Sequence, residues 1–137
     1  MGRLMALDYG KKRTGIAVTD ELHLIASGLT TVATIDLMEF LQDYLAKENV
    51  EVFVIGEPRR MNNEPSEAEE YIVPFLDCLA KVFPEISIVR QDERFTSKLA
   101  VQSMIDGGMK RKKRKDKALI DEISATLILQ AYLNKKI

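Results

Sequence analysis

The sequence predicts an α/β fold with a mixed five-stranded sheet flanked by helices. Three short segments of β type come first along the chain and are joined by short polar connections, a pattern typical of an antiparallel meander. Patterns of helical and strand period then alternate to the end of the chain. In α/β proteins this alternation places further strands between covering helices.

The first strands are predicted around a polar turn. Residues 4–7 are apolar and end at Asp8-Tyr9-Gly10, and residues 15–19 resume the β pattern after Lys11-Lys12-Arg13-Thr14. A third strand is predicted over residues 28–33. Residues 51–55 are β-branched and apolar and stop at Gly56, which favours a strand buried on both faces.

Two helices are predicted around that buried strand. The first begins at Asp36, which forms a capping-box pattern with Glu39, and apolar residues then recur at helical spacing to residue 45. The second begins at Ser66, again with an acid three residues later, and continues to about residue 83. Pro74 lies inside this second helix and is expected to kink or break it.

The C-terminal part alternates in the same way. We predict a strand at 86–89, a short helix from Thr96 to Gly107, a basic flexible loop at about 108–117 and a last helix over about 117–134. In the last helix Asp121 is expected in the first turn. One stripe of this helix carries Ile120, Ile123, Leu127 and Ala131, with Asp121 and Ser124 beside it.

Length and composition are those of a globular protein. The 137 residues fit one domain, 1–137, and the 46% hydrophobic and 30% charged residues exclude a long disordered region. Apolar runs are far shorter than the roughly 20 residues that cross a bilayer, and Asp8 interrupts the N-terminal apolar stretch. We therefore expect a cytoplasmic protein with no membrane partner.

A zinc site or a disulfide is not expected. The chain has one cysteine, Cys78, and one histidine, His23, so a resident metal must be held by oxygen ligands. Cys78 falls in an apolar helical stretch, which predicts a buried thiol without chemistry. His23 falls in a polar connection between strands, which favours a surface role over a catalytic one.

Charge is distributed unevenly along the chain. The net charge is −1, but residues 110–117 hold seven bases and one acid, so the remaining chain carries −7. A concentrated basic segment on an acidic body indicates local contact with phosphates. The alternative is a solvated loop.

Three carboxylates occupy positions where sites are often built: Asp8 after the first strand, Glu93 after the last strand, and Asp121 at the start of the last helix. Such positions converge at one edge of an α/β sheet. Carboxylates there would bind Mg²⁺ or Mn²⁺ for phosphodiester hydrolysis. Each acid also has a structural alternative, as a turn acceptor, an ion-pair partner or a complement to the helix N-terminus.

Four local strings are more specific than the single acids. They read DYGKKRTGIAVTD at 8–20, IGEP at 55–58, DERFTS at 92–97 and DEISATLILQ at 121–130. In this order they resemble the D-x-G-x-x-R-x-G-x-A-x-[ST]-D, V-G-x-P, D-E-R-[LF]-[ST]-[ST] and D-x-x-[AS]-A-x-x-I-L-[QE] strings of the YqgF/RuvX family. The resemblance spans nearly the whole chain. It departs from the family at 57–65, where relatives have a leucine and a glycine-containing loop.

The resemblance implies a ribonuclease-H-like fold and a metal-dependent nuclease, with Asp8, Glu93 and Asp121 as catalytic and metal-binding acids and Mg²⁺ or Mn²⁺ as cofactor. Family members are associated with processing the 5′ end of precursor 16S rRNA and were earlier linked to Holliday junction resolution. Arg13 and Arg94 lie in matching strings and would contact phosphate, orient the acids or serve as structural ion-pair partners. The expected nucleic-acid-binding residues are Arg13, Arg94, Lys110, Arg111, Lys112, Lys113, Arg114, Lys115 and Lys117.

The function expected from the sequence is therefore metal-dependent hydrolysis of structured nucleic acid. The partner is pre-16S rRNA, with a pre-ribosomal particle around it, or branched DNA, and the chain acts as a monomer or a homodimer. A non-catalytic ribosome-assembly factor that binds nucleic acid is the alternative from another class. A nucleotide-phosphate enzyme is disfavoured because the sequence has no second phosphate loop.

Overall fold

A computed structural model describes residues 2–58, 67–92 and 116–136 of the chain. Five strands form one mixed sheet in the order β3-β2-β1-β4-β5. The first three strands pair antiparallel, and β4 and β5 run parallel to β1. The predicted α/β class and the five-stranded mixed sheet are confirmed. The strands are β1 (Arg3–Tyr9), β2 (Arg13–Thr19), β3 (Ala26–Ala33), β4 (Val50–Glu57) and β5 (Ser87–Asp92).

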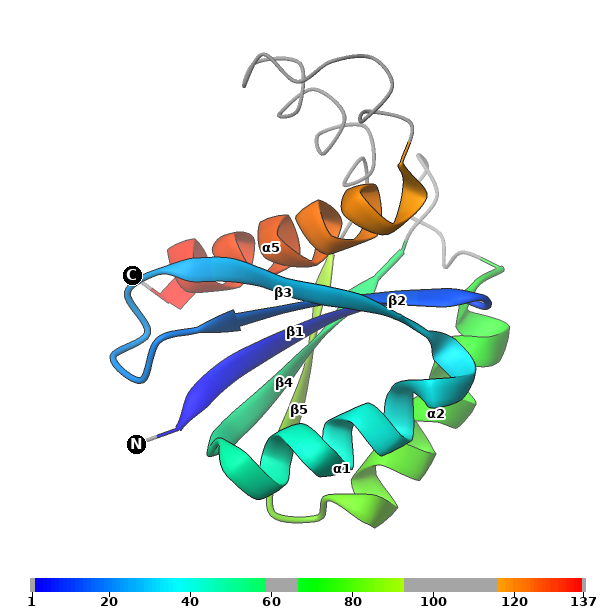
Figure 1. The fold of residues 1–137 in the computed structure, drawn as a ribbon, viewed down its shortest axis with the longest axis horizontal. Coiled ribbons are helices and arrows are strands. Elements are labelled where there is room, and N and C mark those ends of the chain that lie inside the picture. The colour runs from blue at the N-terminus through cyan, green and yellow to red at the C-terminus, as the bar shows by residue number, and fades with distance from the viewer. Residues whose placement is uncertain (1, 59–66, 93–115, 137) are drawn as a thin grey trace.

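The helices of the described residues cover both faces of the sheet. Figure 1 shows α1 (Leu37–Lys47) and α2 (Glu69–Val82) on one face and α5 (Lys117–Lys136) on the other. A short 3-10 helix, η1 (Thr34–Asp36), leads from β3 into α1. No helix in this part of the chain is long and apolar enough to cross a membrane.

Each face of the sheet has its own apolar core. Successive side chains of a strand point to opposite faces, so β1 contributes Met5 and Leu7 to the core under α1 and α2, and Leu4 and Ala6 to the core under α5. Because this alternation continues along β1, the two cores show which helices each of its remaining side chains faces. They also make α5 part of the folded core rather than an appendage.

The capping box predicted at Asp36 does not form. The side chain of Asp36 makes no capping hydrogen bond, because Asp36 ends η1 with helical backbone angles and lacks the extended conformation of a capping residue. The second helix begins at Glu69 after Ala68, and Ser66 lies outside the described residues. Pro74 does not end α2, which continues to Val82.

The buried side of two helices differs from expectation. In α5 the buried residues are Ser124, Ala125, Ile128 and Leu129, and the predicted stripe is left partly exposed. Cys78 is exposed on α2, so the prediction of a buried thiol was wrong. The predicted helix at 96–107 and residues 108–115 of the basic loop lie outside the described residues.

Candidate active site

The candidate site lies where β1 and β4 end and β2 begins. Asp8 is the penultimate residue of β1 and pairs with Gly15 of β2. The alternation of β1 places Asp8 on the same face as Leu4 and Ala6, the face that α5 covers. Asp8 is half-buried there.

Gly15 allows α5 to reach this end of the sheet. A Cβ atom at Gly15 would overlap the backbone carbonyl of Asp121, so the helix lies directly against the strand at this point. Gly15 is also the residue that pairs with Asp8. The fold thus brings Asp8 and Asp121, 113 positions apart, to the same face and the same end of the sheet.

Asp121 is positioned within α5 rather than at its start. Asp116 caps the helix, because its Oδ1 accepts hydrogen bonds from the backbone N–H groups of Ala118 at 3.0 Å and Leu119 at 3.3 Å. Asp121 is therefore the fifth residue of α5, and its predicted place in the first turn was wrong. Lys117, a predicted phosphate contact, is exposed at the beginning of the helix.

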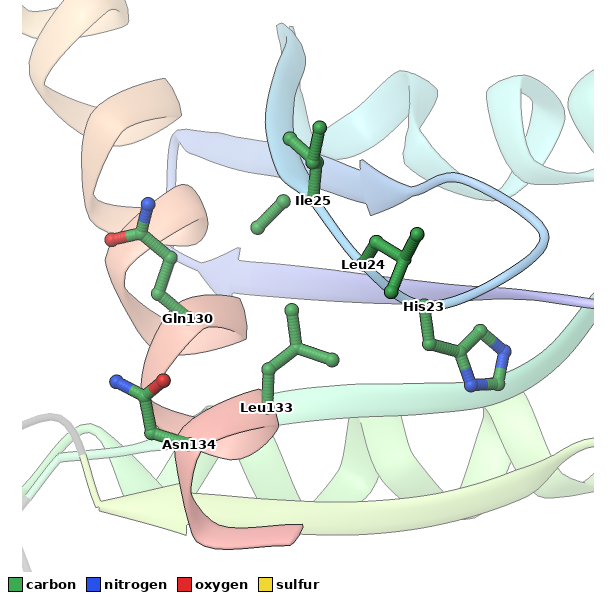
Figure 2. Close-up of a pocket in the computed structure, with 7 residues that line it drawn as sticks. His23, Leu24, Ile25, Gln130, Leu133 and Asn134 are labelled. Atoms are coloured by element: carbon green, nitrogen blue, oxygen red, sulfur yellow. The ribbon is translucent and has the colours of Figure 1, made fainter. Parts of the chain in front are cut away.

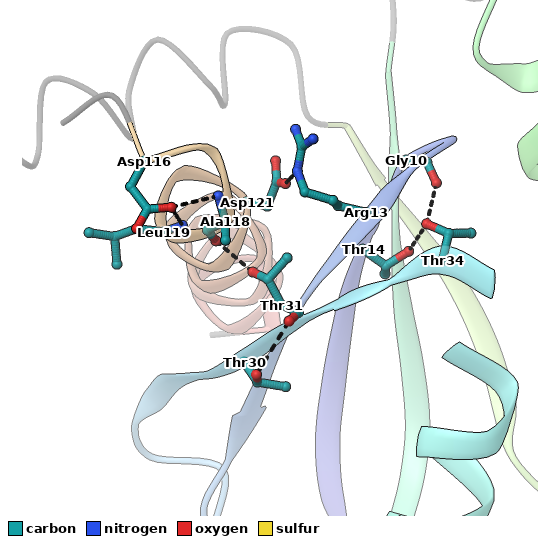
Figure 3. A network of polar contacts seen from close by, with 10 residues as sticks. All are labelled: Gly10, Arg13, Thr14, Thr30, Thr31, Thr34, Asp116, Ala118, Leu119 and Asp121. Atoms are coloured by element: carbon teal, nitrogen blue, oxygen red, sulfur yellow. Dashed lines mark hydrogen bonds and ion pairs between the residues drawn. The ribbon is translucent and has the colours of Figure 1, made fainter. Parts of the chain in front are cut away.

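Arg13 is bonded to one of the two acids. Its Nε donates to Asp121 Oδ2 at 2.8 Å, and the side chains are 38% and 21% exposed (Figure 3). A hydrogen bond between charged groups of this length fixes the carboxylate orientation. This contact fits two of the roles considered for Arg13, orienting an acid and serving as a structural ion-pair partner.

A threonine pair fixes the turn that carries Arg13. The Thr34 hydroxyl donates to the carbonyl of Gly10 at 2.6 Å, so the buried Thr14 hydroxyl donates to Thr34 Oγ1 at 3.0 Å (Figure 3). The backbone N–H of Thr34 also donates to the carbonyl of Lys12 at 2.9 Å. The sequence reasoning missed this network, since Thr14 and Thr34 belong to different predicted elements.

Arg90 joins neighbouring elements on the opposite face of the sheet, the face covered by α2. Its guanidinium donates to Glu69 Oε1 at 2.7 Å and to the carbonyl of Gly56 at 3.0 Å, tying β5 to α2 and to the end of β4. Only its position before the DERFTS string marked it in the sequence.

Burial raises the pKa of Tyr9, the residue after Asp8, and Tyr71 raises it further. The Tyr9 ring stacks on Phe75 with centroids 4.1 Å apart.

The donors at this end of the sheet match a hard divalent cation. Asp8 and Asp121 supply carboxylate oxygens, which Mg²⁺ and Mn²⁺ prefer. No group of three or more His, Cys, Asp or Glu side chains suited to a metal occurs within residues 2–58, 67–92 and 116–136. The third predicted acid, Glu93, and the predicted contacts Arg94 and Lys110 to Lys115 lie outside those residues.

Comparison with known families gives a match over nearly the whole chain. A family model described as "RuvX: Holliday junction resolvase" matches residues 2–135. The chain belongs to the RuvX family. Membership confirms the expected family and enzyme class, a nuclease that hydrolyses phosphodiester bonds.

RuvX relatives are similar over essentially their whole length. A protein of Christiangramia forsetii is 63% identical over 97% of this chain and 98% of its own. Proteins of Flavobacterium johnsoniae and Porphyromonas gingivalis are 55% and 56% identical, covering 99% and 98% of this chain and 99% and 97% of their own. All three carry the name "Putative pre-16S rRNA nuclease".

A solved structure supports the fold. The RuvC chain of Thermus thermophilus in complex with a Holliday junction substrate matches with a TM-score of 0.57 and 18% identity, over 99% of this chain and 97% of that chain. At this identity the match establishes the fold. The predicted ribonuclease-H-like fold is confirmed.

Proposed function

We propose that this RuvX protein is a divalent-metal-dependent nuclease that processes the 5′ end of precursor 16S rRNA, with Asp8, Glu93 and Asp121 as its catalytic acids. The proposal is supported by the packing of the Asp121 backbone against Gly15, the β2 residue that pairs with Asp8. Two carboxylates from distant segments, on one face and at one end of the sheet, are the arrangement that phosphodiester hydrolysis with metal ions requires.

The residues divide the chemistry between them. Asp8 and Asp121 would hold Mg²⁺ or Mn²⁺, with Glu93 as a further ligand. When bound, the metal supplies an activated water and neutralises charge on the phosphate. Arg13 uses Nε for Asp121, which leaves the terminal guanidinium N–H groups as donors for a phosphate oxygen.

Recognition would act through the nucleic-acid backbone. Lys11 and Lys12 are exposed on the turn between β1 and β2, next to Arg13, and residues 110–117 carry the dense basic run. The chain has no tryptophan and few aromatic residues to stack on bases. Affinity should therefore fall steeply with salt, as expected when phosphates exchange counterions for Lys and Arg.

RNA is favoured as substrate because the similar RuvX proteins carry the pre-16S rRNA nuclease name. Branched DNA is the second candidate, favoured by the family description and by the RuvC match. The two differ in substrate and share the chemistry. The substrate and the acids are therefore tested in one experiment.

The test compares cleavage of a 5′-labelled precursor 16S rRNA fragment and of a four-way DNA junction, each with Mg²⁺, Mn²⁺ or chelator over a salt series. The variants are Asp8→Asn and Asp121→Asn. The matched control is Asp43→Asn, an exposed carboxylate on α1. The proposal expects metal-dependent cleavage of the RNA that both site variants lose and the control keeps.

Other outcomes would redirect the proposal. Cleavage of the junction alone would move the substrate to branched DNA while leaving the acids in place. Salt-sensitive binding without cleavage in any metal would favour the ribosome-assembly factor. Cleavage retained by Asp8→Asn and Asp121→Asn would contradict the assignment of the acids.

A further inference from the structure

Two buried side-chain oxygen atoms have no hydrogen-bond partner. Within the residues that the structure describes, three buried side-chain nitrogen or oxygen atoms lack one: Arg90 Nε, Gln91 Oε1 and Ser124 Oγ. Arg90 Nε belongs to a guanidinium that already bonds Glu69 and the carbonyl of Gly56. The oxygens of Gln91 and Ser124 have no such compensation, and a buried acceptor without a partner destabilises the fold. These two oxygens therefore call for a function.

Gln91 lies on the same face of the sheet as Asp8. In β5, Val89 packs in the core under α5, and the alternation of side chains along a strand returns Gln91 to that face. Arg90, between them, bonds Glu69 of α2 on the opposite face. Gln91 is therefore near the end of β5 and on the face that α5 covers.

Gln91 also shares a row of the sheet with Asp8. Leu7 of β1 pairs with Ile55 of β4, so the next residues along these two strands are Asp8 and Gly56. Gly56 in turn pairs with Gln91 of β5. Because Gly56 has no side chain, β4 places none between Asp8 and Gln91 in this row.

Ser124 approaches the same region from α5. The Glu122 side chain lies against β3, because a Cβ atom added at Gly28 would be 2.6 Å from its Oε1. Ser124 comes two residues later, about 200° further around the helix, and is 1% exposed. In the sheet order β1, β4 and β5 lie away from β3. Ser124 therefore faces the sheet on the side of Asp8, about one turn after Asp121.

These side chains together offer only oxygen to a ligand. Asp8 and Asp121 supply carboxylates, Gln91 an amide carbonyl and Ser124 a hydroxyl. Hard divalent cations bind carboxylate and side-chain carbonyl oxygens and retain water on the remaining positions. A cation attracted by the two carboxylates would provide both uncharged oxygens with the partner that they lack, either directly or through its hydration.

We propose that Gln91 Oε1 and Ser124 Oγ belong to the cation site of Asp8 and Asp121 and stabilise bound Mg²⁺ or Mn²⁺. The inference rests on the proposed function and extends its metal site by two uncharged oxygens. Each oxygen has no partner among the described residues. Removing either one should therefore weaken cation binding and leave the fold intact.

The test combines Mn²⁺ binding by calorimetry with thermal melting without metal, for wild type, Gln91→Met and Ser124→Ala. Methionine is unbranched like glutamine, and alanine differs from serine by the hydroxyl, so each change removes chiefly the polar group. Each variant should bind Mn²⁺ about 10–100-fold more weakly. Its melting temperature without metal should equal or exceed that of wild type, because an unpaired buried polar group is removed.

Two exposed residues provide matched controls. Gln130 lies in the C-terminal half of α5, where it lines a hollow beside Leu24 and Ile25 (Figure 2). Ser27 is exposed on β3. Gln130→Met and Ser27→Ala repeat the two substitutions away from the site, and both variants should bind Mn²⁺ like wild type.

Gln91→Glu tests the sign of the effect. It places a charged oxygen where the amide oxygen was, so Mn²⁺ should bind more tightly than to wild type. Without metal the melting temperature should fall, because the new carboxylate is repelled by Asp8. A glutamine with a purely structural role would show the fall in melting temperature without the gain in affinity.

The outcomes separate this inference from the proposed function. Wild-type affinity in Gln91→Met and Ser124→Ala, with binding lost in Asp8→Asn, would overturn the inference and leave the metal site in place. Lower melting temperatures without metal, at unchanged affinity, would assign both oxygens to the fold and overturn it as well. No Mn²⁺ binding by wild type, or full binding by Asp8→Asn, would contradict the proposed function itself.

Discussion

The candidate active site and the β3 edge are built in opposite ways. The site collects charged side chains from distant segments: Asp8 from β1, Arg13 from β2 and Asp121 from α5. The edge is one continuous stretch, residues 22–35, with no charge and with side chains left exposed by the fold. One region depends on tertiary contacts for its existence, and the other on local sequence and its place in the sheet.

The difference has consequences for mutation. At the site the backbones of β2 and α5 are in contact, so a small change in one element moves a functional group in another. At the edge a change alters the surface and leaves the core in place. Matched substitutions in the two regions should therefore differ in their effect on stability.

The largest difference is expected for two glycines. Gly15→Ala should lower the free energy of unfolding by about 3 kcal/mol, because the new Cβ overlaps the backbone of Asp121 and the helix must shift. Gly28→Ala should cost less than about 1 kcal/mol, because its Cβ meets the flexible end of the Glu122 side chain. Urea denaturation of both variants measures this, and equal costs would show that α5 does not rest on Gly15.

Two threonines extend the comparison to hydrogen bonds. Thr14→Val should cost about 1–2 kcal/mol, since it removes a buried hydroxyl that donates to Thr34. Thr30→Val on β3 should change stability by no more than about 0.5 kcal/mol, because its hydroxyl makes one long contact of 3.5 Å with the Thr31 carbonyl. Thermal melting distinguishes the two variants, and a silent Thr14→Val would contradict a fixed turn.

Arg13→Gln should have a smaller effect whose size depends on metal. Without metal it should cost up to about 1 kcal/mol, because the ion pair with Asp121 is partly exposed. With Mg²⁺ or Mn²⁺ the rise in melting temperature should exceed that of wild type, because the Arg13 guanidinium no longer competes with the metal for Asp121. Arg3→Gln, which breaks the pair with Glu48, is the control and should leave the metal effect unchanged.

The smallest effect is expected at Asp20, in the turn before β3. Backbone hydrogen bonds, first that of Ile25, lower the pKa of Asp20. The stability that these hydrogen bonds to Asp20 contribute is therefore present above the ordinary aspartate pKa. It is lost as pH falls through the lowered pKa of the folded state. The amide NMR signals of Leu24 and Ile25 should titrate with Asp20 in acid, and in Asp20→Asn this titration should disappear.

Local patterns predicted most of the fold. The strand at 28–33 was found within two residues of β3 (Ala26–Ala33), because β-branched and turn residues report backbone preference directly. The capping box at Asp36 failed because Asp36 ends the 3-10 helix η1 and so has a helical backbone conformation. The side of α5 that faces the sheet was also predicted wrongly, because it depends on the close approach of the helix to Gly15, a contact between distant segments.

The acids were identified from strings, and their geometry was not predictable from them. Asp121 and Arg13 are 108 positions apart, and no sequence spacing encodes their 2.8 Å contact. The charge-free stretch at 22–35 was visible in the sequence. Its place at the edge of the sheet was not, because that depends on the order of the strands.

Asp8 and Asp121 are proposed to form one metal site. Mn²⁺ binding measured by calorimetry in a double-mutant cycle of Asp8→Asn and Asp121→Asn tests this most directly. Two ligands of one ion are strongly coupled. Each single variant should lose nearly as much affinity as the double variant. Additive losses, or wild-type affinity in either single variant, would contradict a shared site.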